Sequence, residues 1–431
     1  MNRGFRLLWA AEASSKLGSS VTNVALPLIA VTTLDATAFQ ATLLYAATWL
    51  PWLLIGLPAG AWVDRARRRP VMIACDLVSV LLFLSVPAAA WLGVLSIGQL
   101  LAVAVAAGTV AVFFQTASQA YLPSLLAAGD LPRGNAMLHG TESTMQVAGP
   151  GAAGLIIQLA GATSAVLADA VSFAVSALCI WSIPDREPRP ARTPARLRRD
   201  VVEGVRFVAG DPYLRVLTVY GAASNVGLIG YQSLLVVFLV REVGIGGGTV
   251  GLLIAAISCG GVLGAALATP LARRAGTARA MLLCELGATP FGLLIPLTRP
   301  GAGLLFLVAG GLVIGAGVVA GNVVKAAFRQ QYTPPRLLGR VLVSMQFLNL
   351  GAIPLGALIA GGLATAIGIR AAMWCMTGGL ALTGLLLLIG PLKSRRDLPE
   401  IPISYGGDRS PVRRRPGCDT GSDPGRRAGP R

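Results

Sequence analysis

The sequence predicts an all-α membrane protein with about twelve transmembrane helices in two pseudo-symmetric six-helix bundles. First, 54% of the 431 residues are hydrophobic and only 13% are charged, against about 25% charged residues in a typical soluble domain. Second, the apolar residues fall into long stretches separated by short polar loops. Third, the arginines gather in alternate loops. A helix needs about 20 apolar residues to cross the bilayer, so twelve such helices account for most of the chain.

Twelve apolar stretches of suitable length follow one another along the chain. Their approximate ranges are 7–32, 42–63, 71–92, 97–121, 136–159, 162–183, 214–240, 249–270, 279–297, 303–328, 341–366 and 370–392. In lipid, every backbone polar group needs an internal partner, so each stretch is expected to form a helix. Glu12 and Lys16 interrupt the first apolar run, which then continues through Val31. This run is too long for a signal peptide, and we expect an uncleaved first helix.

The basic residues are distributed unevenly between alternate loops of the +17 chain. One side holds the arginine clusters at 65–69, 273–279 and 329–340 together with the tail. The other side holds only scattered arginines, namely Arg241, Arg299 and Arg370. Cytoplasmic loops are enriched in Lys and Arg, so we expect both termini in the cytoplasm and a multi-pass protein of the inner (cytoplasmic) membrane. No folded polar domain offers a basic face for nucleic acid, and we expect no nucleic-acid binding.

A long loop rich in Pro and Arg divides the predicted helices into two sets of six. The expected organisation is an N-terminal bundle at 1–183, a cytoplasmic linker at 184–213, a C-terminal bundle at 214–392 and a disordered basic cytoplasmic tail at 393–431. Within the linker, Val201, Val205 and Val208 are spaced for one apolar face of a helix. We expect this helix, from about residue 197 to residue 208, to lie on the inner membrane surface.

An internal repeat supports the division into two halves. A Tyr-x-Pro sequence ends the fourth apolar stretch at 121–123, and another ends the tenth at 332–334. Each is followed by a short basic loop and then by a helix with Gly and Pro in its middle, around Pro150 and Pro354. We expect these two helices to face each other as symmetry mates.

The loop at 60–71 reads G-A-W-V-D-R-A-R-R-R-P-V. It is similar to the helix 2–3 signature of the major facilitator superfamily, Gly-x-x-x-Asp-Arg-x-Gly-Arg-Arg, and the six-plus-six helices with a long central loop resemble that superfamily as well. The matching residues are Gly60, Asp64, Arg65, Arg68 and Arg69, whereas Arg67 replaces the second Gly. The resemblance implies a cytoplasmic gate in which the carboxylate pairs with arginine. Alternatively, the arginines only anchor the topology.

The fifth stretch resembles the Gly-Pro-x-x-Gly-Gly motif of exporters in this superfamily. It contributes Gly149, Pro150, Gly151 and Gly154, with Ala153 in place of the first of the two final glycines. Together with A-V-S-F after Asp169, F-R-L-L-W near the start and R-G-N-A at 133–136, this resembles the drug- and siderophore-exporting branch of bacterial efflux carriers (enterobactin-exporter-like or macrolide-efflux-like). The resemblance covers residues 5–392 and implies export. The glycines alone also fit ordinary close packing of helices.

The sequence departs from this family in one respect. Many proton-coupled drug exporters of the superfamily have an arginine motif midway along helix 4, but the stretch at 97–121 contains no charged residue. This difference argues against the usual proton relay of the family in this chain.

Five ionisable residues inside the apolar stretches are candidates for proton coupling or for lining a central cavity. They are Glu12, Lys16, Glu142, Asp169 and Glu285. Ionisable groups in the bilayer are costly and commonly functional, and a carboxyl group in apolar surroundings can exchange a proton near neutral pH. For each, a role in helix packing is the alternative. Asp76 and Lys325 are expected near cytoplasmic helix ends, where they pair or extend toward water.

These observations predict a secondary active transporter that is an antiporter. It would export a lipophilic drug-like or secondary-metabolite molecule against protons by alternating access. An importer with the same fold and a non-transporting membrane scaffold are the alternatives. The sequence has no G-x-x-x-x-G-K phosphate loop, no H-E-x-x-H and no C-x-x-C pair, so we expect neither an enzyme nor a bound cofactor or metal. The expected partners are a small-molecule substrate, protons and the bilayer, and we expect a monomer.

Overall fold

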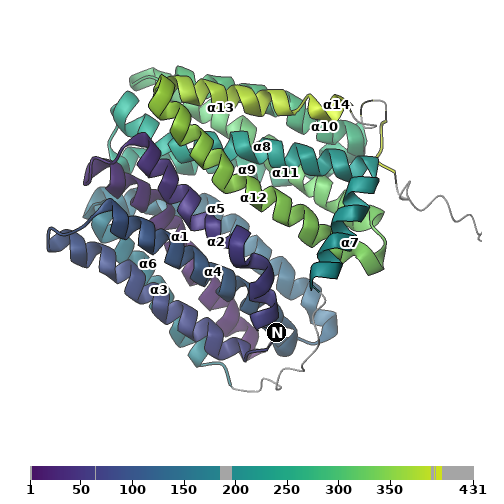
Figure 1. Ribbon diagram of the computed structural model, residues 1–431, viewed down its shortest axis with the longest axis horizontal. Helices are drawn as coiled ribbons and strands as arrows, with labels where there is room; N and C mark the ends of the chain where they lie inside the picture. Colours follow the sequence, from purple (N-terminus) through teal and green to yellow (C-terminus); the bar gives the residue numbers. More distant parts are fainter. Residues whose placement is uncertain (1, 64, 185–196, 390–392, 394, 400–431) are drawn as a thin grey trace, which may run out of the picture.

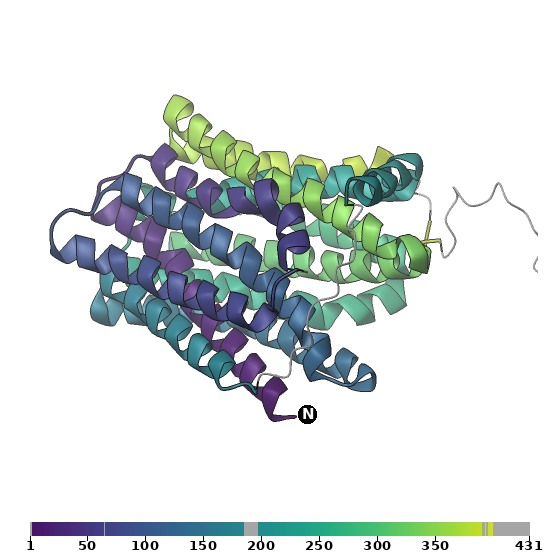
Figure 2. The ribbon, with the colours of Figure 1, turned by 60° about the horizontal axis from the view of Figure 1, so that its bottom comes forward.

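The computed structural model describes residues 2–63, 65–184, 197–389, 393 and 395–399 of the chain, and these residues form helices and connecting turns without a strand. In two views, helices α1–α6 lie on one side of the molecule and helices α8–α13 on the other (Figures 1 and 2). The two six-helix bundles predicted from the sequence are thus present in the fold.

The first bundle contains six long helices. They are α1 (Arg3–Thr32), α2 (Ala38–Val63), α3 (Arg68–Trp91), α4 (Ile97–Leu125), α5 (Leu131–Ala160) and α6 (Ala162–Trp181), with a short 3-10 turn η1 (Ala128–Asp130) before α5. Asn2 and Ser96 are the N-cap residues of α1 and α4, and their side chains accept hydrogen bonds from backbone N–H groups of the first turn. These caps stabilise the helix starts because the first N–H groups of a helix have no partner within it.

The second bundle follows a connecting helix, α7 (Leu197–Gly210). Its helices are α8 (Pro212–Val237), continued by the π-turn η2 (Phe238–Glu242), α9 (Gly247–Ala275), α10 (Thr277–Ala288), continued by the 3-10 segment η3 (Thr289–Leu297), α11 (Leu304–Tyr332) after η4 (Gly301–Gly303), α12 (Pro335–Ile367), α13 (Ile369–Thr383) and α14 (Leu386–Ile389). Each predicted apolar stretch therefore coincides with a helix or with a helix and its short continuation.

Ten helical segments of the described residues are long and apolar enough to cross a membrane. The two remaining long helices, α1 and α5, have 30 residues each but carry more polar side chains. Glu12 and Lys16 lie on α1 and Glu142 lies on α5. These side chains lower the hydropathy of helices whose length, about 45 Å at 1.5 Å per residue, is ample for a crossing. The fold is that of a multi-pass membrane protein.

The two bundles meet mainly along two helix pairs, α2 with α12 and α5 with α9, and α8 also contacts α1 and α2. Both main contacts depend on glycine. A Cβ atom on Gly154 of α5 would lie 2.8 Å from the backbone of Gly251 on α9, and one on Gly361 of α12 would lie 2.0 Å from Thr42 Oγ1 on α2. The expectation that the Pro150 and Pro354 helices face each other is wrong: α5 packs against α9 whereas α12, which contains Pro354, packs against α2 and α8.

Helix α7 lies against α12 and α8. Gly204 permits the close approach, because a Cβ atom there would lie 2.5 Å from the carbonyl oxygen of Arg340. Glu203 pairs with Arg340 of α12 at 2.5 Å, and Val208 is buried in an aromatic-rich cluster of the second bundle. Val205 is 41% exposed. The helix is thus held by the second bundle, and the prediction that it rests on the membrane surface stays a prediction.

A salt bridge joins the bundles at the end of the molecule opposite the arginine-rich loops. Arg241 of η2 donates to Asp35, in the turn between α1 and α2, over 2.6 Å. Asp35 has φ of +47°, a left-handed conformation that Asp tolerates better than most residues. Its carboxylate therefore reaches across from the first bundle to the second.

Candidate functional site

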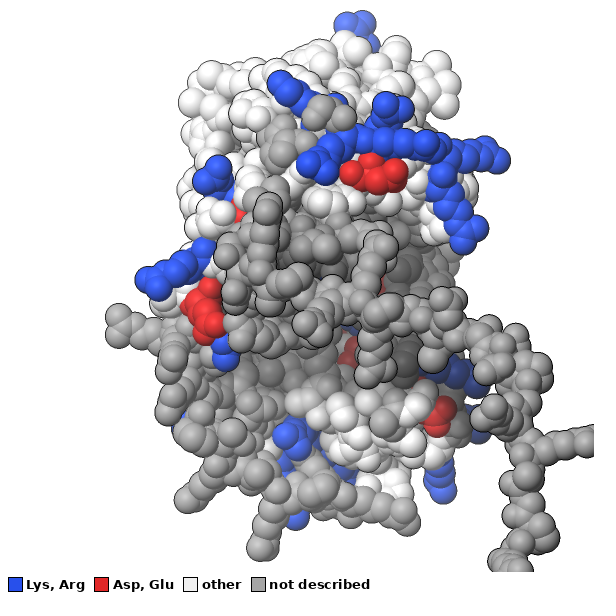
Figure 3. Space-filling view, turned by 90° about the vertical axis from the view of Figure 1, so that its right-hand side faces the viewer, with Lys and Arg blue, Asp and Glu red and all other residues white. Residues whose placement is uncertain are grey.

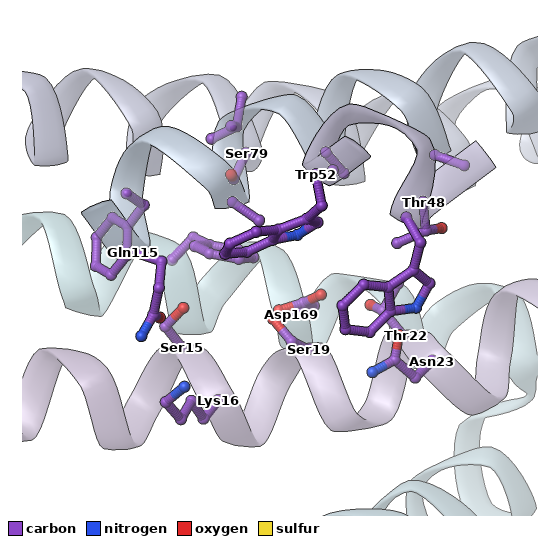
Figure 4. Close-up of a pocket in the computed structure, with 18 of the residues that line it drawn as sticks. Ser15, Lys16, Ser19, Thr22, Asn23, Thr48, Trp52, Ser79, Gln115 and Asp169 are labelled. Atoms are coloured by element: carbon purple, nitrogen blue, oxygen red, sulfur yellow. The ribbon is translucent and has the colours of Figure 1, made fainter. Parts of the chain in front are cut away.

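A cavity of about 750 Å³ lies within the first bundle. Figure 4 shows side chains from several helices of this bundle around it, and residues of α12 line another side. Helices α1 to α6 supply most of its walls, and among the described residues Gln346, Phe347 and Leu350 of α12 line it from the second bundle. Its aromatic lining residues are Tyr45, Trp49, Trp52, Phe83, Phe114, Phe173 and Phe347. Its uncharged polar lining residues are Ser15, Ser19, Thr22, Asn23, Thr48, Ser79, Gln115, Thr116, Gln119 and Gln346. Aromatic surfaces with a few polar groups are typical of binding sites for organic molecules.

Lys16 connects two carboxylates at the cavity wall. Its ammonium nitrogen lies 3.1 Å from Glu142 Oε1 and 4.0 Å from Glu12 Oε2. Ser118 of α4 also donates a hydrogen bond to Glu12, whose side chain is 7% exposed. Of the three side chains only Glu12 is buried, since Lys16 is 25% and Glu142 39% exposed, so water also screens the Lys16–Glu142 pair. The helical spacing of Glu12 and Lys16 indicated their shared face, whereas the pairing with Glu142 required the fold.

Asp169 is fully buried on α6 and lines the cavity. Its Oδ1 atom accepts a hydrogen bond from Ser172 over 3.1 Å, and it lies beside Ser19 in Figure 4. Gly18 of α1 allows this approach, because a Cβ atom there would be 2.4 Å from the same oxygen. No basic side chain of the described residues pairs with Asp169.

Asp76 also lines the cavity, which the sequence analysis did not expect. It is fully buried, and Ser176 of α6 donates to its Oδ2 atom over 2.7 Å while its Oδ1 atom has no hydrogen-bond partner. The expectation that Asp76 pairs or extends toward water near a helix end is wrong, because α3 turns this residue inward. A short repeat in the sequence relates this position to another acid: M-x-x-C-D at 72–76 matches M-x-x-C-E at 281–285. The two motifs lie on α3 and α10, the third long helix of each bundle, so Asp76 and Glu285 occupy equivalent positions.

Glu285 does not line this cavity. It is 1% exposed within the second bundle, and Lys325 of α11 pairs with it at 2.6 Å. Tyr220 of α8 donates a hydrogen bond to the other carboxylate oxygen. Lys325 thus forms an ion pair inside the bundle, which is one of the two alternatives expected for it. Of the five candidate residues, the described cavity brings together Glu12, Lys16, Glu142 and Asp169 but not Glu285.

The predicted gate motif lies at the arginine-rich end of α2 and α3. Arg69 donates to the carbonyl oxygens of Ile180 and Trp181 at 3.2 Å and 2.5 Å, which fixes the start of α3 to the end of α6. Arg68 lies in the first turn of α3, and the N–H of Arg65 bonds the Trp62 carbonyl oxygen. Gly60 has open space around it. Asp64 lies outside the described residues.

The glycines of α5 make close helix contacts. A Cβ atom on Gly149 would lie 2.3 Å from the Ser20 side chain of α1, and one on Gly151 would lie 3.2 Å from Ala255 of α9. Gly154 continues this row toward α9. The motif around Pro150 therefore lies where α5 meets both its own bundle and the opposite one.

Comparison with known proteins identifies relatives over nearly the whole chain. The sequence profile of the transmembrane secretion effector family matches residues 1–404. The multidrug efflux pump Tap of Mycolicibacterium fortuitum is 30% identical over 416 residues, which cover 92% of this chain and 98% of that protein.

The fold is shared with solved transporters. A bacterial homologue of the iron transporter ferroportin in its inward-facing state is similar with a TM-score of 0.72 and 16% identity, over 91% of this chain and 99% of that one. The same homologue in an outward-facing state gives a TM-score of 0.57 and 17% identity, over 92% and 100% of the two chains. The resemblance inferred from the loop and helix motifs is confirmed: the chain belongs to the transmembrane secretion effector family of the major facilitator superfamily.

Proposed function

We propose that the protein exports a lipophilic small molecule across the cytoplasmic membrane in exchange for protons. The observation that supports this most directly is the composition of the cavity. Aromatic walls can hold an apolar organic solute. Asp76 and Asp169 are buried in the same walls without a basic partner among the described residues. A buried carboxylate without a cation is costly, so binding and release of a proton would neutralise and restore it during each cycle.

The relatives support the direction of transport. Tap is named a multidrug efflux pump, and a shared family makes efflux the simplest expectation for this chain. The closer similarity to the inward-facing ferroportin homologue, 0.72 against 0.57, favours a conformation in which the cavity opens toward the cytoplasm. The arginine-rich end would then be cytoplasmic, as the positive-inside rule requires. One chain contains both bundles, so we propose a monomer as the working unit.

Transport is tested in everted membrane vesicles with a panel of fluorescent lipophilic compounds. Vesicles that contain the protein should accumulate at least one compound when respiration builds a proton gradient, and vesicles without it should not. A protonophore should abolish the accumulation. If accumulation persisted after collapse of the gradient, proton exchange would be excluded while export would stand. Accumulation only in right-side-out vesicles would indicate import.

Two substitutions test the proposed proton carriers. Asp169→Asn and Asp76→Asn keep the shape of the side chain but remove its exchangeable proton. We expect each variant to lower proton-driven accumulation at least tenfold, because proton transfer depends on a side chain that is positioned to bind and release the proton. Asp130→Asn, at an exposed residue outside the cavity, is the matched control and should transport normally. Wild-type proton-driven transport in both cavity variants would exclude these residues as carriers.

A further inference from the structure

A second cavity opens at the surface of the other bundle, at the arginine-rich end of α9 and α10. It measures about 810 Å³ and is lined by Arg274, Ala275, Arg279, Leu282, Leu283, Leu286, Gly287 and Arg396. Figure 3 shows that basic side chains gather on this face over the second bundle. The cavity shares no residue with the central cavity, and neither transport nor the proton relay explains it.

The chain builds this cavity from two distant segments. The N–H of Ala278 donates to the carbonyl oxygen of Arg396 at 3.1 Å, and Asp397 Oδ1 accepts from the N–H of Thr277 at 3.0 Å. Leu398 in turn donates its N–H to Thr277 Oγ1 at 2.8 Å. Gly276 makes room for this segment, because it has φ of +90° and its Cβ position would lie 2.4 Å from the Arg396 carbonyl oxygen. Arg396 is thereby fixed beside α10.

Three guanidinium groups of the cavity lack a carboxylate partner. Arg274, Arg279 and Arg396 make no ion pair within 4.0 Å in the described part of the chain. Other arginines of the protein are paired: Arg340 with Glu203 and Arg370 with Glu242. The nearest acid in the sequence, Asp397, already caps the first N–H group of α10. The cavity thus keeps three positive charges available for an anion.

The opposite wall of the cavity is apolar and leads away from the charges along α10. Leu283 is 55% exposed on the outside of the bundle, and a Cβ atom on Gly287 would meet nothing within 4 Å. Arg279 and Leu286 are seven residues apart, which corresponds to about 10 Å along a helix. This is the distance from the headgroup level of a bilayer into its hydrocarbon region. Charges at one end and leucines at the other match an amphiphilic anion.

We propose that this cavity binds an anionic phospholipid of the surrounding leaflet. The three arginines would hold the phosphate groups, because guanidinium groups bind phosphate oxygens in bidentate fashion. The leucines and the space beside Gly287 would take the upper part of an acyl chain. Basic pockets between transmembrane helices are a suitable chemistry for such headgroups. With three charges, the site would favour a lipid with two phosphates over a lipid with one.

Native mass spectrometry of the delipidated full-length protein tests this proposal. The probes are tetraoleoyl cardiolipin, dioleoyl phosphatidylglycerol and dioleoyl phosphatidylcholine, each titrated separately. We expect binding in the order cardiolipin, phosphatidylglycerol, phosphatidylcholine. Arg274→Gln combined with Arg279→Gln should weaken cardiolipin binding about 25-fold, since each basic residue near an anionic lipid contributes about fivefold. Arg273→Gln, on the same turn but outside the cavity lining, is the matched control and should bind like the wild type.

A second variant keeps every charge and fills the apolar end. Gly287→Leu places a side chain in the open space beside α10 and should weaken cardiolipin binding severalfold, whereas soluble glycerol phosphate should compete poorly in all variants. Equal binding of the three lipids, or unchanged cardiolipin binding in both the double variant and Gly287→Leu, would overturn the proposal. Competition by glycerol phosphate at the same concentration as the lipid would show a site for a free phosphate ester instead. None of these readouts depends on transport.

Discussion

Two buried acids at equivalent positions of the two bundles have different neighbours. Glu285 is neutralised by Lys325 at 2.6 Å and lies away from the central cavity. Asp76 accepts one hydrogen bond from Ser176, lines the cavity and has no cation beside it among the described residues. Lys325 compensates the negative charge of Glu285. The negative charge of Asp76 has no such partner among the described residues, so a proton or a bound cation would have to compensate it. The two bundles therefore place equivalent acids in different surroundings: Glu285 takes part in an ion pair inside its bundle, whereas Asp76 lines the cavity, where we propose that it exchanges a proton.

The Glu285–Lys325 pair leads to a prediction of stability. Glu285→Gln should lower the free energy of unfolding by about 3 kcal/mol, because it leaves the Lys325 ammonium buried without a counter-charge. The double variant Glu285→Gln with Lys325→Met should recover most of the loss, since it removes both charges together. Thermal unfolding in detergent, followed by intrinsic fluorescence, measures both. If the double variant were as unstable as the single one, the ion pair would not be the source of the effect.

The helices were predictable because each apolar stretch has the length that the bilayer imposes. The sequence also shows how many charged residues each helix carries, but it does not show toward which neighbour each charged side chain points. Residues 12 and 16 share a face by spacing alone. Asp76, Asp169 and Glu285 look alike in sequence, yet two line the cavity and one pairs inside a bundle. The direction depends on helix rotation about its axis, which is set by contacts such as Gly18 against Asp169. The contribution of Arg396 to a site on α10 could not be read from sequence for the same reason.

At the scale of the helices, the contact between α5 and α9 depends on two facing glycines. Each lies so close to the other helix that a Cβ atom on Gly154 or Gly251 would approach backbone atoms within 2.8 Å and 2.2 Å, respectively. Small residues allow backbones to pack without side chains between them. Because these helices belong to opposite bundles, the contact can exist in one conformation of a rocking cycle and be lost in another.

This contact predicts a conformational effect of side-chain size. Gly154→Val should separate the ends of α5 and α9 by several ångströms and reduce transport strongly. The new side chain would overlap backbone atoms of α9, so the helices have to move apart as whole elements. Gly140→Val on the same helix is the control, since nothing lies within 4 Å of its Cβ position. Electron–electron double resonance between spin labels on exposed positions of α5 and α9 measures the separation. An unchanged distance in Gly154→Val would contradict the proposed role of the glycine contact.

At the scale of the whole molecule, the bundles are also linked by an exposed ion pair. Asp35 and Arg241 meet at 2.6 Å at the end opposite the arginine-rich loops, and the side chain of Asp35 is 96% exposed. Exposed pairs contribute only about 0–1 kcal/mol. Such a contact cannot lock the transporter, but it can bias an equilibrium between two conformations of similar free energy.

Arg241→Gln should therefore shift the balance between the two conformations by at most about fivefold. The shift should favour opening at this end, and 1 M salt should produce the same change in the wild type, because salt screens exposed charges. Single-molecule fluorescence energy transfer across the two bundles at this end measures the populations. A salt response that persisted unchanged in Arg241→Gln would show that other charges set the balance.

The two bundles contribute unequally to the central cavity: residues from all six helices of the first bundle line it, whereas α12 is the one described helix of the second bundle that does so. A molecule held there would travel with the first bundle while α12 slides past it as the only moving wall. The residues of the first bundle, which keep their distances from one another, would then mainly determine the affinity for the solute. Phe347 and its neighbours on α12 would mainly determine the rate at which the solute leaves. Substitutions in the first bundle would therefore change the substrate specificity with little effect on the rate of substrate release.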